Sequence, residues 1–231
     1  GASGFIGSHL AEFLISKHKS VIATYHDEEK HLESIESLKK VRWDITEDFE
    51  SIPSCKVWYH LASLTDMKKC NDNPELAREV NTQSIINVLN NAEKSNCETF
   101  VYISTLGVYG EPMFLPINEI HPTNPVEVYS RSKKKAEELL LSKLTSIKKT
   151  IIIRLFNTFG PRQNEFMIIP YILSNLKRSR SIEIKNFYSS RDFTYISDIV
   201  NGIFLAGLNG RDREIYNLGS GNETTIENLI Q

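Results

Sequence analysis

The chain has 231 residues and a formal net charge of −2 at pH 7, with 40% hydrophobic and 24% charged residues. This balance is typical of a globular protein, and it excludes the basic surface by which proteins bind nucleic acid or an acidic membrane. The longest apolar runs are too short to span a bilayer. From the net charge and these short runs together, we expect neither nucleic acid nor membrane as a partner. The three cysteines lack CxxC spacing, which indicates free thiols in a reducing, cytoplasmic compartment and no metal site.

The chain begins with a loop that holds Gly1, Gly4 and Gly7, and a run that suits a helix follows. A helix that starts after such a loop points its free N–H groups at the loop, where an anion binds well. We predict that Gly1 makes the turn, Gly4 admits a pyrophosphate and Gly7 lets the helix pack close to a sheet. An ordinary glycine turn is the alternative, because a dinucleotide loop is confirmed only by a strand directly before it.

Apolar runs and amphipathic stretches alternate in the first half of the chain. Strands are expected at residues 21–25, 41–45, 57–62 and 100–104, a polar helical connection at 31–40, and a helix from 74 to about 94. Such alternation predicts a parallel sheet with helices on both faces. Ligands of such sheets bind beyond the carboxyl ends of the strands, so candidate site residues are sought there.

The end of the strand at 21–25 is where a dinucleotide fold reads the adenosine ribose. An acidic residue there favours the ribose 2′-hydroxyl of NAD, and a cationic residue favours the 2′-phosphate of NADP. The sequence reads Tyr25-His26-Asp27, which places no acid at the strand tip, and His26 is only a weak cation at neutral pH. Both cofactors therefore stay open, and Asp27 fits a solvated turn as well as a ribose ligand.

The strand at 100–104 leads to Thr105 and a proline-rich loop, after which a helix begins near Tyr129. Tyr129 and Lys133 stand at i and i+4 and therefore share one helix face. A neighbouring ammonium lowers the pKa of a phenol, which makes Tyr129 a candidate acid/base, with a hydroxyl of Thr105 or Ser104 holding the substrate oxygen. The alternative is a surface tyrosine beside a solvated basic helix start.

Taken together, these segments resemble the extended short-chain dehydrogenase/reductase family, in its NAD-dependent epimerase/dehydratase branch acting on nucleotide sugars. The matching segments are residues 1–10 (GASGFIGSHL), 44–45, 60–62 (HLA), 104–110 (STLGVYG), 129–133 (YSRSK), 154–161 (RLFNTFGP), 191–198 (RDFTYISD) and 216–221 (YNLGSG). The resemblance implies a Rossmann doubly wound parallel sheet over residues 1–160. It also implies a small C-terminal substrate lobe over 161–231, of which 191–220 partly returns to the sheet.

The resemblance implies a role for each matched residue. Tyr129 is the base, Lys133 positions the nicotinamide ribose and depresses the tyrosine pKa, and Thr105 is the catalytic hydroxyl. The implied contacts with NAD or NADP are Gly1, Gly4, Phe5, Ile6, Gly7, His26, Asp44, Ile45, Leu61, Ala62, Ser63, Asn81 and Ser104, together with Tyr129 and Lys133. Asn157, Arg191 and Thr105 would contact the nucleotide-diphosphate sugar, Arg191 through the diphosphate, which suits a planar guanidinium. Asp198 is equally well explained as the cap of a helix at 199–208.

The residues after Thr105 separate the branches of the family. Its 4,6-dehydratases carry Asp-Glu there, and certain decarboxylases and related dehydratases carry Ser-Glu, whereas this chain has Leu106-Gly107. Neither residue transfers a proton, so we expect a C4 epimerase first and a 4-keto-sugar reductase or dehydrogenase second. The rival class is a sensor that binds the dinucleotide or nucleotide sugar without turnover. Such relatives would be expected to lose Thr105, Tyr129 or Lys133, and all three are present.

The family has a strand before its first glycine, at the centre of the sheet, and this sequence lacks it. We therefore expect a fragment of a longer chain, truncated at both ends, whose last residues begin a helix capped by Thr224 or Thr225. The substrate lobe is expected to hold a helix at 167–177 and a strand at 182–185. A homodimer through the helices at 76–94 and 129–144 is also expected from the resemblance.

Overall fold

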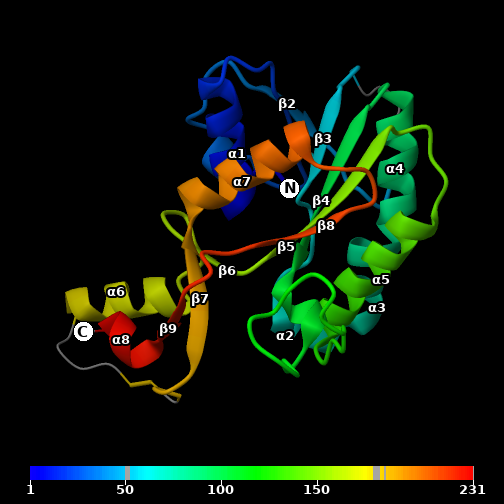
Figure 1. Ribbon diagram of the computed structural model, residues 1–231. Coiled ribbons are helices and arrows are strands. Elements are labelled where there is room, and N and C mark those ends of the chain that lie inside the picture. Colours follow the sequence, from blue (N-terminus) through cyan, green and yellow to red (C-terminus); the bar gives the residue numbers. More distant parts are fainter. Residues whose placement is uncertain (50–52, 179–182, 185, 231) are drawn as a thin grey trace.

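The computed structural model describes residues 1–49, 53–178, 183–184 and 186–230, and its centre is a four-stranded parallel sheet (Figure 1). The sheet has the order β3-β4-β5-β8 and consists of β3 (Val57–His60), β4 (Thr99–Thr105), β5 (Lys149–Leu155) and β8 (Ile215–Leu218). A second parallel pair, β1 (Ile22–Tyr25) and β2 (Lys39–Arg42), is not hydrogen-bonded to it. The predicted α/β class with a parallel sheet is confirmed.

Helices cover both faces of the central sheet, because its middle strands are apolar on both faces. Val101 and Ile103 of β4 pack with α1 (Phe5–Ser16) and α7 (Ile196–Asn209). Phe100 and Tyr102 alternate with these residues along β4 and therefore project from the opposite face of the sheet. There they pack with α4 (Ser84–Lys94) and α5 (Val128–Ser142). The remaining helical segments on the α5 side are α2 (Met67–Asp72), α3 (Pro74–Arg78) and the π-helical turn η2 (Glu79–Gln83).

A smaller group of elements stands apart from the sheet at the lower left of Figure 1. It contains β6 (Asn157–Phe159), α6 (Ile168–Arg178), β7 (Ser190–Tyr195), β9 (Glu223–Thr225) and α8 (Ile226–Ile230). β6 is parallel to β7, and β9 is antiparallel to it. The chain between β7 and β9 returns to the main body, where α7 packs on α1 and β8 pairs with β5.

Several predicted boundaries change in the structure. The connection at 31–40 is not a helix: it holds only a 3-10 turn, η1 (Lys30–Leu32), and then β2, because Leu32 and Ile35 anchor it against α1 and β1. The helix at 74–94 forms, but the π turn η2 interrupts it. Of the strand expected at 182–185, residues 182 and 185 lie outside the described residues and 183–184 are irregular.

The helix caps also differ from the prediction in one place. α7 begins at Ile196, so Asp198 lies in its first turn and does not cap it. Thr225 does cap α8, since its hydroxyl oxygen accepts from the Asn228 N–H at 3.1 Å. Within the described ranges, no helix is both long and apolar enough to cross a membrane. Among the same residues, no three His, Cys, Asp or Glu side chains are grouped so as to hold a metal ion.

Candidate active site

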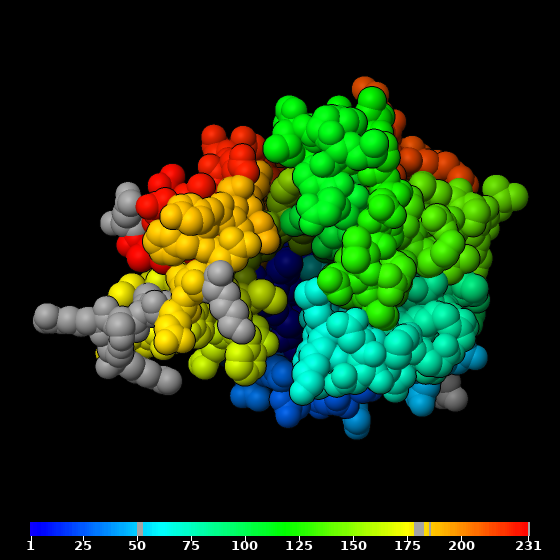
Figure 2. All heavy atoms as spheres, turned by 90° about the horizontal axis from the view of Figure 1, so that it is seen from below, coloured from blue at the N-terminus to red at the C-terminus, as the bar shows by residue number. Residues whose placement is uncertain are grey.

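The molecule is hollowed between the sheet and the smaller group of elements. Figure 2 shows this cleft from below, with residues near the start of the chain (dark blue) at its floor. Cyan and green segments, which follow β3 and β4, form one wall, and yellow to gold segments of the smaller group form the other. The cleft thus lies at the carboxyl ends of the parallel strands, where a sheet of this kind binds its ligands.

The glycine loop at the floor of the cleft is built by close backbone approach. A Cβ on Gly1 would lie 2.5 Å from the backbone nitrogen of Ala62, so this glycine lets the end of β3 touch the loop. A Cβ on Gly7 would lie 2.2 Å from the Gly1 carbonyl oxygen. Gly7 therefore lets α1 approach the backbone of the loop closely, and its role in packing the helix against the sheet stays a prediction. A Cβ on Gly4 would meet only the Gly1 oxygen, at 3.5 Å, so space is left beside it.

The start of α1 is suited to an anion. Gly4 is its N-cap and offers no side chain to the first amides, and the first turn, all of it described, carries no acidic residue. The helix bonds begin with Ser8, whose N–H donates to the Gly4 oxygen at 3.0 Å. The preceding N–H groups are those that a helix start leaves to caps, water or a ligand. With the space beside Gly4, these residues fit the pyrophosphate of a dinucleotide.

The exits of β1 and β2 meet at an acidic cluster. The His26 imidazole contacts Asp44 through Nε2 and Asp27 through Nδ1, both at 3.1 Å. Burial raises the pKa of Asp44, but hydrogen bonds from Thr46 and the neighbouring His26 outweigh it and hold that pKa below its ordinary value. The structure therefore joins two residues expected near the adenosine, His26 and Asp44, whereas the Ile45 side chain is buried in the core beside α4.

A second hydrogen-bond cluster joins the end of β3 to α5. The Asn81 side-chain oxygen accepts from the Ser63 hydroxyl at 2.8 Å and the Leu64 N–H at 2.7 Å. Its amide donates to the Ser132 hydroxyl at 3.0 Å, and that hydroxyl donates to the Tyr129 carbonyl at 2.7 Å. Asn81 lies in the π turn η2, a local geometry that recurs at functional sites.

Thr105 lies at the end of β4, and the loop after it contacts the start of α5. Its hydroxyl oxygen accepts from the Gly107 N–H at 3.2 Å and caps the 3-10 turn η3 (Leu106–Tyr109). A Cβ on Gly107 would lie 2.5 Å from the Ser130 hydroxyl oxygen, so the loop after Thr105 lies directly on the start of α5. The loop that follows Thr105 and the helix turn that carries Tyr129 are thus in contact.

Lys133 is buried and Tyr129 is partly buried, and the electrostatics of the two residues differ from the prediction. Burial raises the pKa of Tyr129 to about 12, although a hydrogen bond with Ser63 works in the opposite direction. Lys133 is 2% exposed, and burial lowers its pKa to about 7 while the Glu137 carboxylate opposes that fall. The net pKa of Tyr129 is therefore raised and not lowered, because desolvation disfavours the charged form of both partners. The contribution of Lys133 to the proton affinity of Tyr129 stays a prediction.

The predicted sugar contacts lie across the cleft on the smaller sheet. Asn157 of β6 pairs with Phe193 of β7, and Arg191 is two residues before Phe193. Since side chains alternate along a strand, Asn157 and Arg191 project from the same face. The Arg191 guanidinium donates to the Ser190 carbonyl at 2.6 Å, and it forms no ion pair among the described residues. No hydrogen bond within the described part of the chain joins these two residues to Thr105 or Tyr129.

Sequence reasoning missed one buried ion pair. Glu137, which is 0% exposed, accepts from Arg154 at 3.0 and 2.7 Å and from the Ser104 hydroxyl at 2.6 Å. The hydroxyl of Ser104 is thus bonded in the interior, which leaves Thr105 as the hydroxyl at the strand end. Two signals were available: Glu137 is four residues after Lys133 on the same helix face, and Arg154 interrupts an isoleucine-rich strand.

Comparison with known proteins agrees with this geometry. The family model of the NAD dependent epimerase/dehydratase family matches residues 1–219. A putative UDP-glucose 4-epimerase of Methanocaldococcus jannaschii is 31% identical over 242 residues, an alignment that covers 100% of this chain and 78% of that protein. The GDP-6-deoxy-D-mannose reductase of Pseudomonas aeruginosa is 28% identical over 252 residues. That alignment covers 100% of this chain and 76% of the reductase. The structure of MoeE5 in complex with UDP-glucose and NAD is 25% identical, with a TM-score of 0.82 over 98% of this chain and 76% of that chain.

Proposed function

The chain belongs to the NAD-dependent epimerase/dehydratase family, and we propose that within this family it is a nucleotide-sugar 4-epimerase. It is an enzyme of the extended short-chain dehydrogenase/reductase type that uses NAD or NADP; structures of similar proteins hold NAD or NADPH. The observation that carries the proposal is that the loop after Thr105 lies on the start of α5, the helix that carries Tyr129 and Lys133 on one face.

Each of these residues has a separate task in the proposal. Tyr129 takes the proton from the C4 hydroxyl of the sugar, and the Thr105 hydroxyl bonds the same oxygen. The glycine loop and Lys133 would hold NAD, whose nicotinamide would supply the acceptor and the donor of the C4 hydride. Because burial holds the pKa of Tyr129 at about 12, the phenol needs a nearby positive charge to act as a base at neutral pH. Lys133, four residues along the same face of α5, supplies that charge.

The acidic cluster at the end of β1 supports NAD over NADP. Asp27 and Asp44 both contact His26, so two carboxylates border the place where the adenosine ribose is read. A carboxylate accepts a hydrogen bond from a ribose 2′-hydroxyl and repels a 2′-phosphate. We expect NAD to bind more tightly than NADP, and titration of the protein with each cofactor measures the difference.

The residues that face the sugar support epimerisation over dehydration. Leu106 and Gly107, which form the turn after Thr105, carry no group that could remove a proton and expel water. Arg191 is exposed on the opposite wall, where its guanidinium can bind two phosphate oxygens at once. These features support a nucleotide-diphosphate sugar whose ring is oxidised and reduced at one carbon.

A reductase is the second candidate, because the chain is 28% identical to a GDP-6-deoxy-D-mannose reductase. Such an enzyme would use the same proton and hydride transfers once, on a 4-keto sugar, and would consume its cofactor. The two candidates therefore differ in cofactor balance and share the residues of the site.

The test is an assay of product and cofactor together. The purified protein is analysed for bound nucleotide and is then incubated with UDP-, dTDP-, GDP- and CDP-sugars. We expect retained NAD and interconversion of the two C4 epimers with no net NADH formed. Stoichiometric NADPH consumption on a 4-keto sugar would identify the reductase. Binding of cofactor and sugar without any product would identify the sensor.

We also propose that the enzyme is a homodimer through the outer surface of α3, α4 and α5. Leu76 of α3 and Ile86 of α4 are 39% and 45% exposed, so each of these helices offers an apolar side chain that a partner could cover. Light scattering on the eluting protein measures the mass in solution. The variant Ile86→Asp is expected to shift it toward the monomer.

A further inference from the structure

An ion pair with almost no solvent exposure lies beneath the helix that carries Tyr129 and Lys133. Glu137 on α5 is 0% exposed and Arg154 on β5 is 2% exposed. Two hydrogen bonds of 3.0 and 2.7 Å join the guanidinium to the two carboxylate oxygens. Taking both charges out of water costs several kcal/mol per ion, and apolar residues of the same size often stabilise a core better. Stability alone therefore gives a weak reason for this pair.

The contacts of Glu137 lead to two parts of the site. Its carboxylate accepts from the Ser104 hydroxyl at 2.6 Å, one residue before Thr105 at the end of β4. Lys133 lies one helical turn before Glu137 on the same face of α5. The Lys133 ammonium also stands 4.2 Å from the centre of the Tyr102 ring, which projects from β4. Glu137 is thus in contact with the strand of Thr105 and adjacent to the helix turn of Lys133.

The other groups around Lys133 do not supply a negative charge. His60 of β3 is buried, and burial, with Lys133 nearby, holds its pKa well below the ordinary value, so it is neutral. Burial raises the pKa of Tyr102 well above 10, and Tyr129 on α5 is a phenol as well. Among the described residues that face Lys133 from β3, β4 and α5, Glu137 is the carboxylate.

We propose that Glu137 is a positioning residue for the reaction: its carboxylate, clamped by Arg154, holds Lys133 as an ammonium and fixes the strand end that presents Thr105. The effect on turnover rests on the proposed function, whereas the effect on the charge of Lys133 does not. Arg154 fixes the carboxylate from the side of β5, and its guanidinium lies 4.7 Å from the centre of the Tyr109 ring. The Tyr109 hydroxyl donates to Asn217 of β8 at 2.6 Å, which extends the support across the sheet.

The direction of the effect follows from the charges. Burial already lowers the pKa of Lys133 to about 7, and the Glu137 carboxylate is the group that opposes this fall. Without the carboxylate, more of Lys133 is neutral at pH 7. Tyr129 then lacks the neighbouring cation that offsets its burial, and its proton becomes harder to remove.

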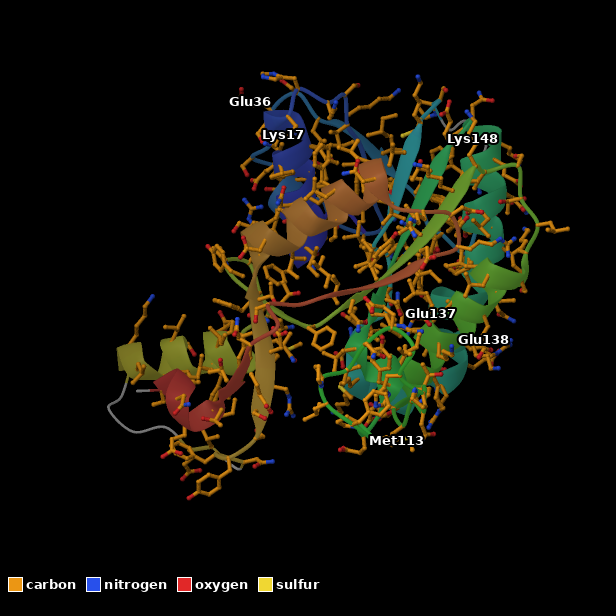
Figure 3. The ribbon with its side chains drawn as sticks, in the orientation of Figure 1. Lys17, Glu36, Met113, Glu137, Glu138 and Lys148 are labelled. Atoms are coloured by element: carbon orange, nitrogen blue, oxygen red, sulfur yellow. The ribbon has the colours of Figure 1, made fainter. Side chains whose placement is uncertain are left out.

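The test compares Glu137→Gln with the matched control Glu138→Gln. Glu138 is the next residue of α5, has a side chain 47% exposed and pairs with Lys135 at 2.8 Å on the outer side of the helix (Figure 3). The protein is labelled with ¹³Cε-lysine, and the Lys133 signal is identified by its loss in Lys133→Met. We expect the Lys133 titration midpoint to move to lower pH in Glu137→Gln and to stay in place in Glu138→Gln.

Activity gives the second measurement. A fall of about one unit in a pKa near 7 reduces the charged fraction of a lysine at pH 7 roughly fivefold. We therefore expect kcat at pH 7 to fall about fivefold in Glu137→Gln and to be unchanged in Glu138→Gln. Glu137→Asp, which keeps the charge, should regain part of the rate. A Lys133 midpoint equal to that of the wild type in Glu137→Gln would overturn the proposal, even if the variant were less stable or slower.

A further variant keeps the test decisive if Glu137→Gln does not fold. In Glu137→Gln with Arg154→Met, both buried charges are removed together, so no unpaired guanidinium is left in the core. We expect this protein to fold and still to show the lower Lys133 midpoint, and an unshifted midpoint would overturn the proposal. If the wild type turns over no sugar, the proposed function fails, while the lysine titration still decides the role of Glu137.

Discussion

The two walls of the cleft differ in the solvent exposure of their charged side chains. On the wall formed by the central sheet and α5, Lys133, Glu137 and Arg154 are at most 2% exposed. On the wall formed by β6, β7 and β9, Arg191 is exposed and forms no ion pair within the described residues. The difference fits two tasks. In the proposed function, the first wall would move a proton with groups whose pKa values burial has shifted. The second wall would bind a charged ligand through a cation that stays open to water.

The largest expected effect is a loss of turnover, and it is expected at Tyr129 on the wall formed by the central sheet and α5. Tyr129→Phe removes the proposed proton acceptor and keeps the partly buried ring, so we expect kcat to fall by about 10²–10⁴ while NAD affinity is retained. Turnover of a nucleotide sugar and NAD titration measure the two quantities. The control is Tyr188→Phe, since Tyr188 is 82% exposed and lies outside the site. Turnover within tenfold of the wild type would place the base on another residue.

In the glycine loop between the walls, Gly4 and Gly7 are expected to respond differently to substitution by alanine. A Cβ on Gly7 would overlap the Gly1 carbonyl oxygen, so Gly7→Ala is expected to lower the free energy of unfolding by about 1–3 kcal/mol. Gly4 has extended backbone with φ −76° and open space beside it, so Gly4→Ala should keep the stability and weaken NAD binding instead. Urea unfolding and cofactor titration test both. Equal stability loss in the two variants would contradict this division.

The burial of Lys133 predicts a pH-dependent stability. The folded pKa is about 7 against an ordinary 10.5, so between these values the unfolded chain binds the proton that the folded chain lacks. Through this group, stability therefore rises with pH from about 7 to 10.5, and the burial penalty is largest below pH 7. Lys133→Met should raise the stability at pH 6 by on the order of a few kcal/mol, and the gain should shrink by pH 10.

Thermal unfolding at several pH values measures that gain. Lys148→Met is the matched control, because the Lys148 side chain is 70% exposed and its ion pair with Glu98 lies at the surface (Figure 3). Such surface pairs contribute little, so this variant should follow the wild type at every pH. A gain from Lys133→Met that is the same at pH 6 and pH 10 would show that Lys133 is not discharged in the folded protein.

The smallest expected effect concerns the exposed wall. Arg191→Lys keeps the charge and loses the bidentate hydrogen bonds that a planar guanidinium donates to phosphate oxygens. KM for a nucleotide sugar should therefore rise about tenfold, with kcat nearly unchanged. The melting temperature should stay that of the wild type, because the side chain is exposed. Arg211→Lys is the control, because Arg211 is exposed in the turn between α7 and β8. A fall in kcat without a rise in KM would give Arg191 a role in the reaction step.

The sequence by itself determined much of this protein. The alternating apolar runs predicted the parallel sheet. The strands expected at 57–62 and 100–104 form at 57–60 and 99–105, and the helix expected at 129–144 forms at 128–142. The helix expected at 74–94 forms with an interruption at 79–83. Gly1, Thr105, Tyr129 and Lys133 were named from local patterns, because a glycine loop, a strand end and an i, i+4 spacing are short-range features. The roles of these residues stay predictions.

Only the tertiary structure decided how these residues behave. Glu137 and Arg154 are seventeen residues apart, and nothing in their local sequence states that they meet in the core and bind Ser104. The pKa of Tyr129, expected low beside Lys133, is raised to about 12 instead, because desolvation depends on how completely β4, η2 and α5 enclose the pair. Residue type and spacing are local properties, whereas burial is set by every element that packs around a site, and it is burial that controls proton affinity here.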